Sequence, residues 1–356
     1  MRTPGAKQVR GRALGAGALG AALLATACSA DQPPPAPRTT SRAAPSTAPA
    51  PSSAAASAAT SRAPDGTAPL TGLPATPALL AGPVLAVKVD NVPAALPQAG
   101  LDAADLVIEE PVEGGLTRLM AVFHSRTTGR VGPVRSARVS DAGLVQALGG
   151  GGLAFSGASG ASLRWLRREP RVTLVMPSGW TWRRDSRRSA PHNLYLHEQA
   201  EYGRYAARLP GPARRQFSFG PAAAGGTPTS SAQVRFQAAS AGWTWGGRDW
   251  QRSQQGRADK LETGRRISAA NVVVLQVRTT TDKRFHDKNG ASTPIMDLTS
   301  GGPGWLLRDG RSYRGSWQRG PDGRFTLLAA DRTEIPLKPG STWIELLPAP
   351  AAPTLR

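Results

Sequence analysis

The chain has 356 residues and a formal net charge of +20 at pH 7, with 44 lysines and arginines against 24 aspartates and glutamates. Its only cysteine is Cys28, which excludes a disulfide within the chain and, for the rest of the sequence, zinc–thiolate sites and cysteine catalysis. The excess of cations favours polyanionic partners. Beyond the N-terminal tail, the length suits one large domain or two of ordinary size.

Residues 1–27 predict a signal peptide. Basic residues without any acid precede the apolar run 13–27, which is shorter than the roughly 20 apolar residues of a membrane-spanning helix. Cys28 follows Leu24-Ala25-Thr26-Ala27, which resembles the lipobox of bacterial lipoproteins except that leucine stands one residue too early. We therefore predict lipidation of Cys28 and an anchor on the outer face of the cell membrane. The alternative is ordinary secretion, because Ala25-Thr26-Ala27 is also an A-x-A cleavage site.

Residues 28–66 predict a lipidated cysteine followed by a disordered tether. After Cys28 the segment consists almost wholly of Pro, Ala, Ser and Thr and shows no apolar periodicity. Such a composition cannot bury enough apolar surface to offset the entropy lost on ordering. The tether would hold the folded part away from the membrane, and the alternative is a spacer without a function of its own.

Residues 67–220 predict a mixed α/β domain. Short apolar runs of strand length are followed by segments with helical character, an order that indicates a sheet with helices on at least one side. The predicted strands are 84–89, 106–108, 119–123, 153–155 and 172–176, and the predicted helices are 140–148, 159–168 and 192–208.

Residues 232–350 predict a mainly β subdomain, which follows a linker at 220–231 rich in Gly, Pro, Ser and Thr. Turn signals such as Asp309-Gly310 and Pro339-Gly340 separate several of the strand-like runs. The fold class expected for the folded part is therefore α+β. The predicted strands are 233–237, 271–277, 304–307, 325–328 and 342–346.

Removal of the four cations of the signal peptide would lower the formal charge from +20 to +16, so the mature chain stays strongly basic. Twelve arginines lie between residues 126 and 188. Outside the membrane, the polyanions within reach are anionic lipid headgroups and wall-linked phosphate polymers, and these or peptidoglycan are the expected partners besides the membrane itself. No nucleic-acid partner is expected for an exported chain. The alternative is a solvated basic surface without a partner.

The densest polar motif runs from residue 109 to 118 and is followed by Gly132-Pro-Val-Arg135-Ser-Ala-Arg138. Paired glycines let backbone N–H groups approach an anion, and arginine forks bind phosphate or carboxylate in bidentate fashion. The alternative is that Glu113 pairs with Arg118 or Arg135 and only fixes a loop. The sequence thus predicts an oxyanion pocket whose candidate residues are Gly114, Gly115, Arg118, Arg135 and Arg138.

A general acid and base of the glycosidase type need two carboxyl groups about 5–10 Å apart. The candidates for such a pair are Asp90, Glu109, Glu110 and Glu113. Glu109 and Glu110 are neighbours in a predicted strand and should point to opposite faces, so at most one of them faces a given site.

The chain has four histidines and no His-Glu-x-x-His motif, so no metal site is expected, and no nucleotide-binding glycine motif predicts a cofactor. His192, in Pro191-His192-Asn193, is expected to cap the following helix or to line the pocket, with Asn193 beside it and Asp90 near.

Several motifs together resemble the YerB-like family of bacterial lipoproteins. In the N-terminal part they are Pro69-Leu-Thr-Gly-Leu73, Val87-Lys-Val-Asp90-Asn91, Glu113-Gly-Gly-Leu-Thr-Arg118, Gly132-Pro-Val-Arg135-Ser-Ala-Arg138 and Pro191-His192-Asn193-Leu194. In the C-terminal part they are Asn271-Val-Val-Val274, Gly315-Ser-Trp317 and Pro339-Gly-Ser-Thr-Trp343. The resemblance implies a surface location and a two-part architecture. It implies no reaction, because the family has no assigned activity.

Three hypotheses follow. The first is a non-catalytic envelope lipoprotein that binds an anionic wall or lipid component through the arginine pocket. The second is an envelope enzyme acting on peptidoglycan or a phosphopolymer, with Glu113 or Asp90 as base and the arginines stabilising charge. The third is an assembly or scaffold factor whose basic face contacts another protein.

Overall fold

A computed structural model describes residues 66–356, which belong to one compact unit. The predicted signal peptide, the predicted lipidation site Cys28 and the tether up to residue 65 lie outside the described residues. The described part combines a large mixed sheet with short helices, which confirms the α+β fold class. Within residues 66–356, no helix has both the length and the apolar character needed to cross a bilayer.

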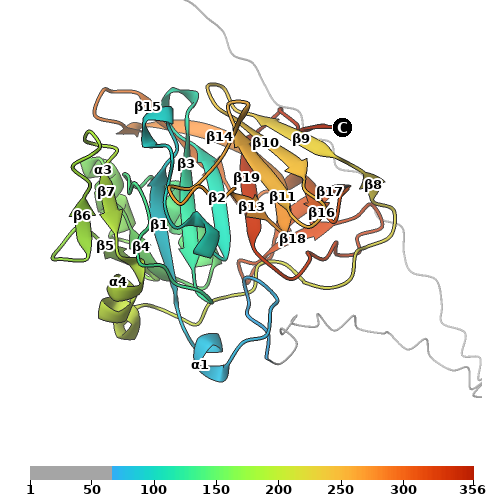
Figure 1. The fold of residues 1–356 in the computed structure, drawn as a ribbon, viewed down its shortest axis with the longest axis horizontal. Helices are drawn as coiled ribbons and strands as arrows, with labels where there is room; N and C mark the ends of the chain where they lie inside the picture. The colour runs from blue at the N-terminus through green and yellow to red at the C-terminus, as the bar shows by residue number, and fades with distance from the viewer. Residues whose placement is uncertain (1–65) are drawn as a thin grey trace, which may run out of the picture. The chain divides into compact units, whose positions relative to one another are not determined.

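A mixed sheet of 12 strands forms the centre of the described part (Figure 1). β19 pairs in parallel with β2 on one side and with β14 on the other, so both predicted parts of the chain contribute strands to this sheet. The strands run in the order β18 (Phe325–Leu328), β17 (Arg311–Arg319), β16 (Gly302–Arg308), β14 (Asn271–His286), β19 (Thr342–Pro348), β2 (Leu106–Pro111), β3 (Thr117–Phe123), β1 (Val84–Asp90), β4 (Gly151–Ala154) and β5 (Val172–Val175), with β15 (Ser292–Asp297) paired to β14 and β8 (Thr227–Pro228) to β17.

The central strands are covered on both faces. β1 and β3 are buried at every position, which explains why their sequences are almost continuous apolar runs rather than alternating ones. Lys88 in β1 and Arg118 in β3 interrupt these runs and are themselves buried. Buried charges of this kind require partners, and the partners define the candidate site described below.

Helices cover one face of the central sheet. α2 (Ser140–Ala147) and α3 (Gly160–Leu166) place Leu144, Val145 and Leu166 in the same apolar cluster as Ile108 and Met120 of the sheet. The short α1 (Pro77–Leu80) precedes β1.

A second sheet covers part of the other face. Trp243 and Trp250 from this sheet pack in one cluster with Val107 and Leu119 of the central strands. This antiparallel sheet has the order β12 (Arg257–Ala258), β11 (Trp250–Gln254), β10 (Ser240–Trp245), β9 (Ser231–Arg235) and β20 (Thr354–Leu355), with β13 (Ser268–Ala269) paired to β11. The hairpin of β6 (Trp182–Arg184) and β7 (Leu194–Leu196), which precedes α4 (Glu198–Tyr205), contributes to the same cluster.

A buried ionic network joins the two sheets. The fully buried Arg252 of β11 donates from Nη2 to Glu109 Oε2 of β2 at 2.6 Å and also pairs with Asp259. Its guanidinium carbon lies 4.7 Å from the centre of the Trp343 ring on β19. Because an unpaired buried charge is costly, this arrangement fixes how the second sheet sits on the first.

Most predicted elements of the N-terminal part are present, and one boundary is wrong. The predicted helix 192–208 starts as strand β7, and α4 begins only at Glu198, after His197 accepts a hydrogen bond from the backbone N–H of Ala200 at 3.4 Å. The strands β10, β11, β15 and β17 were not predicted, because their half-exposed, mixed sequences carry no apolar run.

Arg252→Ala should lower the free energy of unfolding by about 3–5 kcal/mol, because it leaves Glu109 and Asp259 buried without their cation. Urea unfolding measures the change. The matched control is Arg257→Ala, which removes an exposed arginine three residues after Gln254 and should change stability by no more than about 0.5 kcal/mol. Equal effects of the two substitutions would show that the network does not hold the sheets together.

Candidate functional site

Charged side chains gather at one end of β1, β2 and β3. Arg118 of β3 lies opposite Asp90 of β1 on one side and opposite Glu110 of β2 on the other. Since side chains alternate along a strand, Lys88 lies on the same face as Asp90, toward α2. We call this group the ionic cluster, and it consists of Lys88, Asp90, Glu110, Glu113, Arg118, Arg135, Arg138, Asp141 and His192.

Asp90 holds the two most accessible members of the ionic cluster. Its Oδ2 lies 2.9 Å from Nε of Arg135 and 2.7 Å from Nδ1 of His192. The Asp90 side chain is 1% exposed, whereas the side chains of Arg135 and His192 are each 24% exposed. His192 therefore sits at the edge of the site, and the helix-capping role belongs to His197 instead.

Glu113 pairs with Arg138 rather than with Arg118 or Arg135. Arg138 Nη2 lies 2.5 Å from Glu113 Oε2, and the hydroxyl of Thr293 on β15 donates to the other carboxylate oxygen. Burial alone would raise the pKa of Glu113, but the hydrogen bond and charge of Arg138, together with Thr293, outweigh it and hold that pKa below 4.5. Glu113 is therefore ionised at neutral pH and fixes Arg138.

Lys88 and Asp141 complete the ionic cluster and were not among the predicted site residues. Lys88 contacts Glu110, and its Nζ lies 2.9 Å from Asp141 Oδ1, with all three side chains at most 1% exposed. Burial raises the pKa of Glu110 to about 8, and the neighbouring carboxylate of Asp141 acts in the same direction. Glu110 is thus mainly protonated at neutral pH. A lysine inside the apolar run of β1 was the available signal.

Arg118 forms the buried back of the cluster. Burial lowers the pKa of Arg118 to about 10, with the charges of Arg138 and Arg135 acting in the same direction, so it remains a cation. Its Nη1 donates to the carbonyl of Ser136 at 3.0 Å. Among the described residues, the buried Nε of Arg118 and the buried Nε of Arg138 have no hydrogen-bond partner, and Nε of Arg135 has only its ion-pair contact with Asp90.

The balance of charge in the ionic cluster follows from these states. Four cations, one lysine and three arginines, are set against the carboxylates of Asp90, Glu113 and Asp141 when Glu110 is protonated. One positive charge is therefore in excess near pH 7, even without His192. Buried N–H groups without acceptors and an excess positive charge are both features that an oxyanion would satisfy.

Three predicted site residues lie outside the ionic cluster. Gly115, at φ +71°, packs so closely on the turn between β9 and β10 that an added Cβ would lie 2.6 Å from Cβ of Gln237. Its carbonyl accepts from the N–H of Ala238 at 2.8 Å. Gly114 adjoins open space. Asn193 accepts from Nη1 of Arg184 at 2.7 Å and so orders the β6–β7 loop.

The two adjacent glutamates point to opposite faces of the sheet, as predicted. Glu109 contacts Arg252 under the second sheet, and Glu110 contacts Lys88 on the helix side. In the part of the chain from residue 66 onward, no group of three or more histidine, aspartate and glutamate side chains is placed to hold a metal ion.

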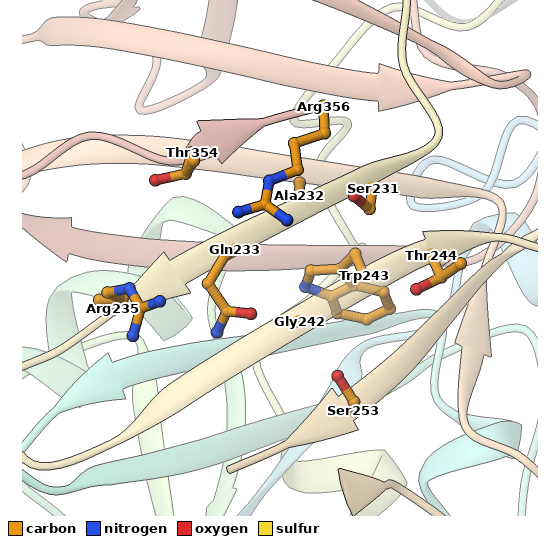
Figure 2. Close-up of a pocket in the computed structure, with 10 residues that line it drawn as sticks. All are labelled: Ser231, Ala232, Gln233, Arg235, Gly242, Trp243, Thr244, Ser253, Thr354 and Arg356. Atoms are coloured by element: carbon orange, nitrogen blue, oxygen red, sulfur yellow. The ribbon is translucent and has the colours of Figure 1, made fainter. Parts of the chain in front are cut away.

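A separate polar trough lies on the outer face of the second sheet (Figure 2). It has a volume of about 250 Å³ and a floor at Gly242, which stands opposite Gln233 on β9 and Ser253 on β11. Figure 2 shows Arg235 and Arg356 on either side of Gln233. None of the predicted site residues lines this trough, because its lining residues come from β9, β10, β11 and the C-terminal residues and form no sequence motif.

Comparison with known proteins identifies the two parts of the chain. Residues 70–208 match the N-terminal domain, and residues 232–344 the C-terminal domain, of a family described as a protein of unknown function (DUF3048). YerB of Bacillus subtilis (strain 168), whose name describes it as a candidate lipoprotein, is 28% identical over 303 residues, which cover 79% of this chain and 86% of YerB.

The fold agrees with this relationship. The crystal structure of YerB from Bacillus subtilis matches with a TM-score of 0.70 and 26% identity, covering 82% of this chain and 99% of that one. The resemblance seen in the motifs is thereby confirmed. The chain belongs to the YerB-like family, whose members combine the N-terminal and C-terminal DUF3048 domains.

Proposed function

We propose that this protein is a lipid-anchored extracytoplasmic protein that binds an oxyanion-bearing component of the cell envelope at the ionic cluster. The observation that carries the proposal is the convergence of Arg118, Arg135 and Arg138: the buried Nε–H groups of Arg118 and Arg138 lack a hydrogen-bond partner among the described residues, and Arg135 is partly exposed and ion-paired with Asp90. The predicted signal peptide and lipobox, and the name of the relative YerB, support the location.

The chemistry of the cluster favours phosphate or carboxylate groups. A buried donor without an acceptor costs about 1–3 kcal/mol, and arginine forks match the oxygens of these anions. Arg135 and His192 are partly exposed and would be the first side chains that a ligand reaches, whereas Arg118 is nearly fully buried behind them. The ligand would bring the negative charge that the cluster lacks.

Binding is better supported than catalysis. Both proposed bases, Asp90 and Glu113, are engaged in ion pairs with arginines. The lowered pKa of Glu113 also makes it a weak proton acceptor at neutral pH. The scaffold hypothesis finds less support, because the exposed large apolar side chains Leu73, Leu116, Trp165 and Trp180 come from four different segments.

Inorganic phosphate should raise the Tm of the protein, because it binds the folded state and not the unfolded chain. At a concentration 100 times its Kd the stabilisation is about 2.7 kcal/mol. Arg135→Ala should abolish the shift, whereas Arg257→Ala, on the exposed β12, should retain it. The measurement is a thermal-shift series at constant ionic strength, extended to glycerol phosphate polymers and acidic wall fragments. If phosphate raises the Tm of Arg135→Ala as much as that of the wild-type protein, the proposed site is wrong.

The affinity for sulfate should fall as the pH rises through about 8, the pKa of Glu110. Sulfate keeps its charge in this range, whereas deprotonation of Glu110 cancels the excess positive charge of the cluster. Two charges up to about 10 Å apart at an effective dielectric constant of about 20 interact by at least about 1.7 kcal/mol, so the loss of affinity should be at least about tenfold.

Titration calorimetry at several pH values checks this prediction with two variants. Glu110→Gln should remove the pH dependence. Glu198→Gln should leave it unchanged, although burial also raises the pKa of Glu198, to about 7, because that side chain bonds Thr128 outside the cluster. Retention of the full pH dependence in Glu110→Gln would contradict the charge balance described above.

Cys28→Ser should move the protein from the membrane fraction to the medium, because no acyl chain can then be attached. Incorporation of labelled palmitate into wild type and its loss in the variant provide the measurement. If the wild-type protein is already in the medium and unlabelled, cleavage occurs at Ala25-Thr26-Ala27 and the anchor does not exist.

A further inference from the structure

Two cavities meet at Trp165, on the surface between α3 and the β14–β15 hairpin. One has a volume of about 330 Å³ and the other about 240 Å³, and both are lined by Trp165, Arg284 and Phe285. The ring centres of Trp165 and Phe285 lie 5.9 Å apart in an edge-to-face contact. In Figure 1 the orange end of this hairpin lies beside the green α3. We call the two cavities together the α3 trough.

The two ends of the α3 trough differ in chemistry. The larger cavity contains an apolar wall, and the smaller one is lined by arginines and contains no acidic side chain. The apolar wall consists of Val139, Ile295, Met296 and Leu298, in addition to Trp165 and Phe285, and the arginines are Arg164, Arg168 and Arg284.

The acidic side chains around the larger cavity have other partners. Asp282 pairs with Arg284 at 2.6 Å, Asp297 pairs with Arg278 at 3.1 Å, and Glu169 accepts from Gln146. No ion pair among the described residues joins any of these three carboxylates to Arg164 or Arg168. At the junction, Trp165 keeps 39% of its surface exposed, and its ring extends the apolar wall of the larger cavity to the smaller one.

We propose that the α3 trough binds one molecule of an anionic amphiphile, with a phosphate group at Arg164 and Arg168 and a hydrocarbon chain against the apolar wall. Arginine forks suit the phosphate, and the larger cavity lies within the size range of small-molecule sites, about 300–1,000 Å³. The occupant is a single lipid-like molecule rather than a bilayer surface, because the apolar side chains line a hollow between a helix and a hairpin. This site shares no residue with the ionic cluster and does not depend on the proposed function.

The test uses the full chain with Cys28→Ser, so that no acyl group of its own competes. Calorimetric titration with dodecyl phosphate, kept below its micelle concentration and carried out with Arg135→Ala added to remove binding at the ionic cluster, should give a stoichiometry of one. Dodecyl maltoside has the same chain with a neutral headgroup, and inorganic phosphate has the headgroup without the chain. Each should bind the α3 trough at least about tenfold more weakly, a difference of about 1.4 kcal/mol.

Two variants separate the ends of the trough. The double substitution of Arg164→Ala and Arg168→Ala should reduce the affinity for dodecyl phosphate to that for dodecyl maltoside. Gly143→Leu should block binding of the hydrocarbon chain, because Gly143 lines the larger cavity and the leucine side chain would occupy it. The substitution fits the fold, since the atom nearest to an added Cβ, Leu298 Cδ1, is 3.8 Å away. Leucine favours the helix more than glycine does, so the Tm should not fall. Arg257→Ala is the control.

Several outcomes would overturn the proposal. Equal affinity for dodecyl maltoside would indicate a site for apolar chains alone. Undiminished binding of dodecyl phosphate in both variants would place its site elsewhere, including the ionic cluster. Binding to vesicles of phosphatidylglycerol without any binding of monomeric dodecyl phosphate would indicate a membrane-docking surface instead. If binding of inorganic phosphate is lost only in Arg135→Ala, the phosphate binds at the ionic cluster. The test of the α3 trough is then the binding of dodecyl phosphate alone.

Discussion

The buried pairing of Arg252 with Glu109 is the interaction on which the relation between the two family domains depends. Glu109 lies on β2, in the N-terminal domain, and Arg252 on β11, in the C-terminal domain. Both side chains are removed from water, so neither is tolerated without the other. The cost of burying an unpaired charge therefore fixes the position of the second sheet on the central sheet. Any other packing that separates this pair would leave a charge in an apolar layer, whereas apolar contacts alone would allow the two sheets to shift relative to each other.

The strand β2 connects this structural network to the candidate site. Glu109 faces the second sheet, and its neighbour Glu110 faces the helices and belongs to the ionic cluster. The two carboxyls differ in their surroundings, because Glu109 has a guanidinium partner and Glu110 shares Lys88 with a second carboxylate. A single strand thus places a structural ion pair on one side and, on the other, a carboxyl group that keeps its proton at neutral pH.

The strands that could be predicted from the sequence are those marked by a continuous apolar run. The runs of β1 and β3 are almost continuously apolar because both faces are covered, and the prediction of these two strands is confirmed. Strands such as β11 alternate between buried and exposed positions and gave no such signal. Arg118, Arg135, Arg138 and Asp90 are close together in the structure, but their pairing depends on register and loop geometry. For the same reason Lys88 and Asp141, which are far apart in sequence, were not joined to the site.

The position of β19 means that the central sheet can be completed only late in synthesis of the chain. This strand comes near the end of the sequence and yet lies in the middle of the central sheet, in parallel with β2 and β14. Until it arrives, both neighbours present an open strand edge, which is a template for pairing with other chains. A chain that has not yet reached β19 therefore cannot complete its central sheet, and the edges of β2 and β14 stay open to wrong pairing during that interval.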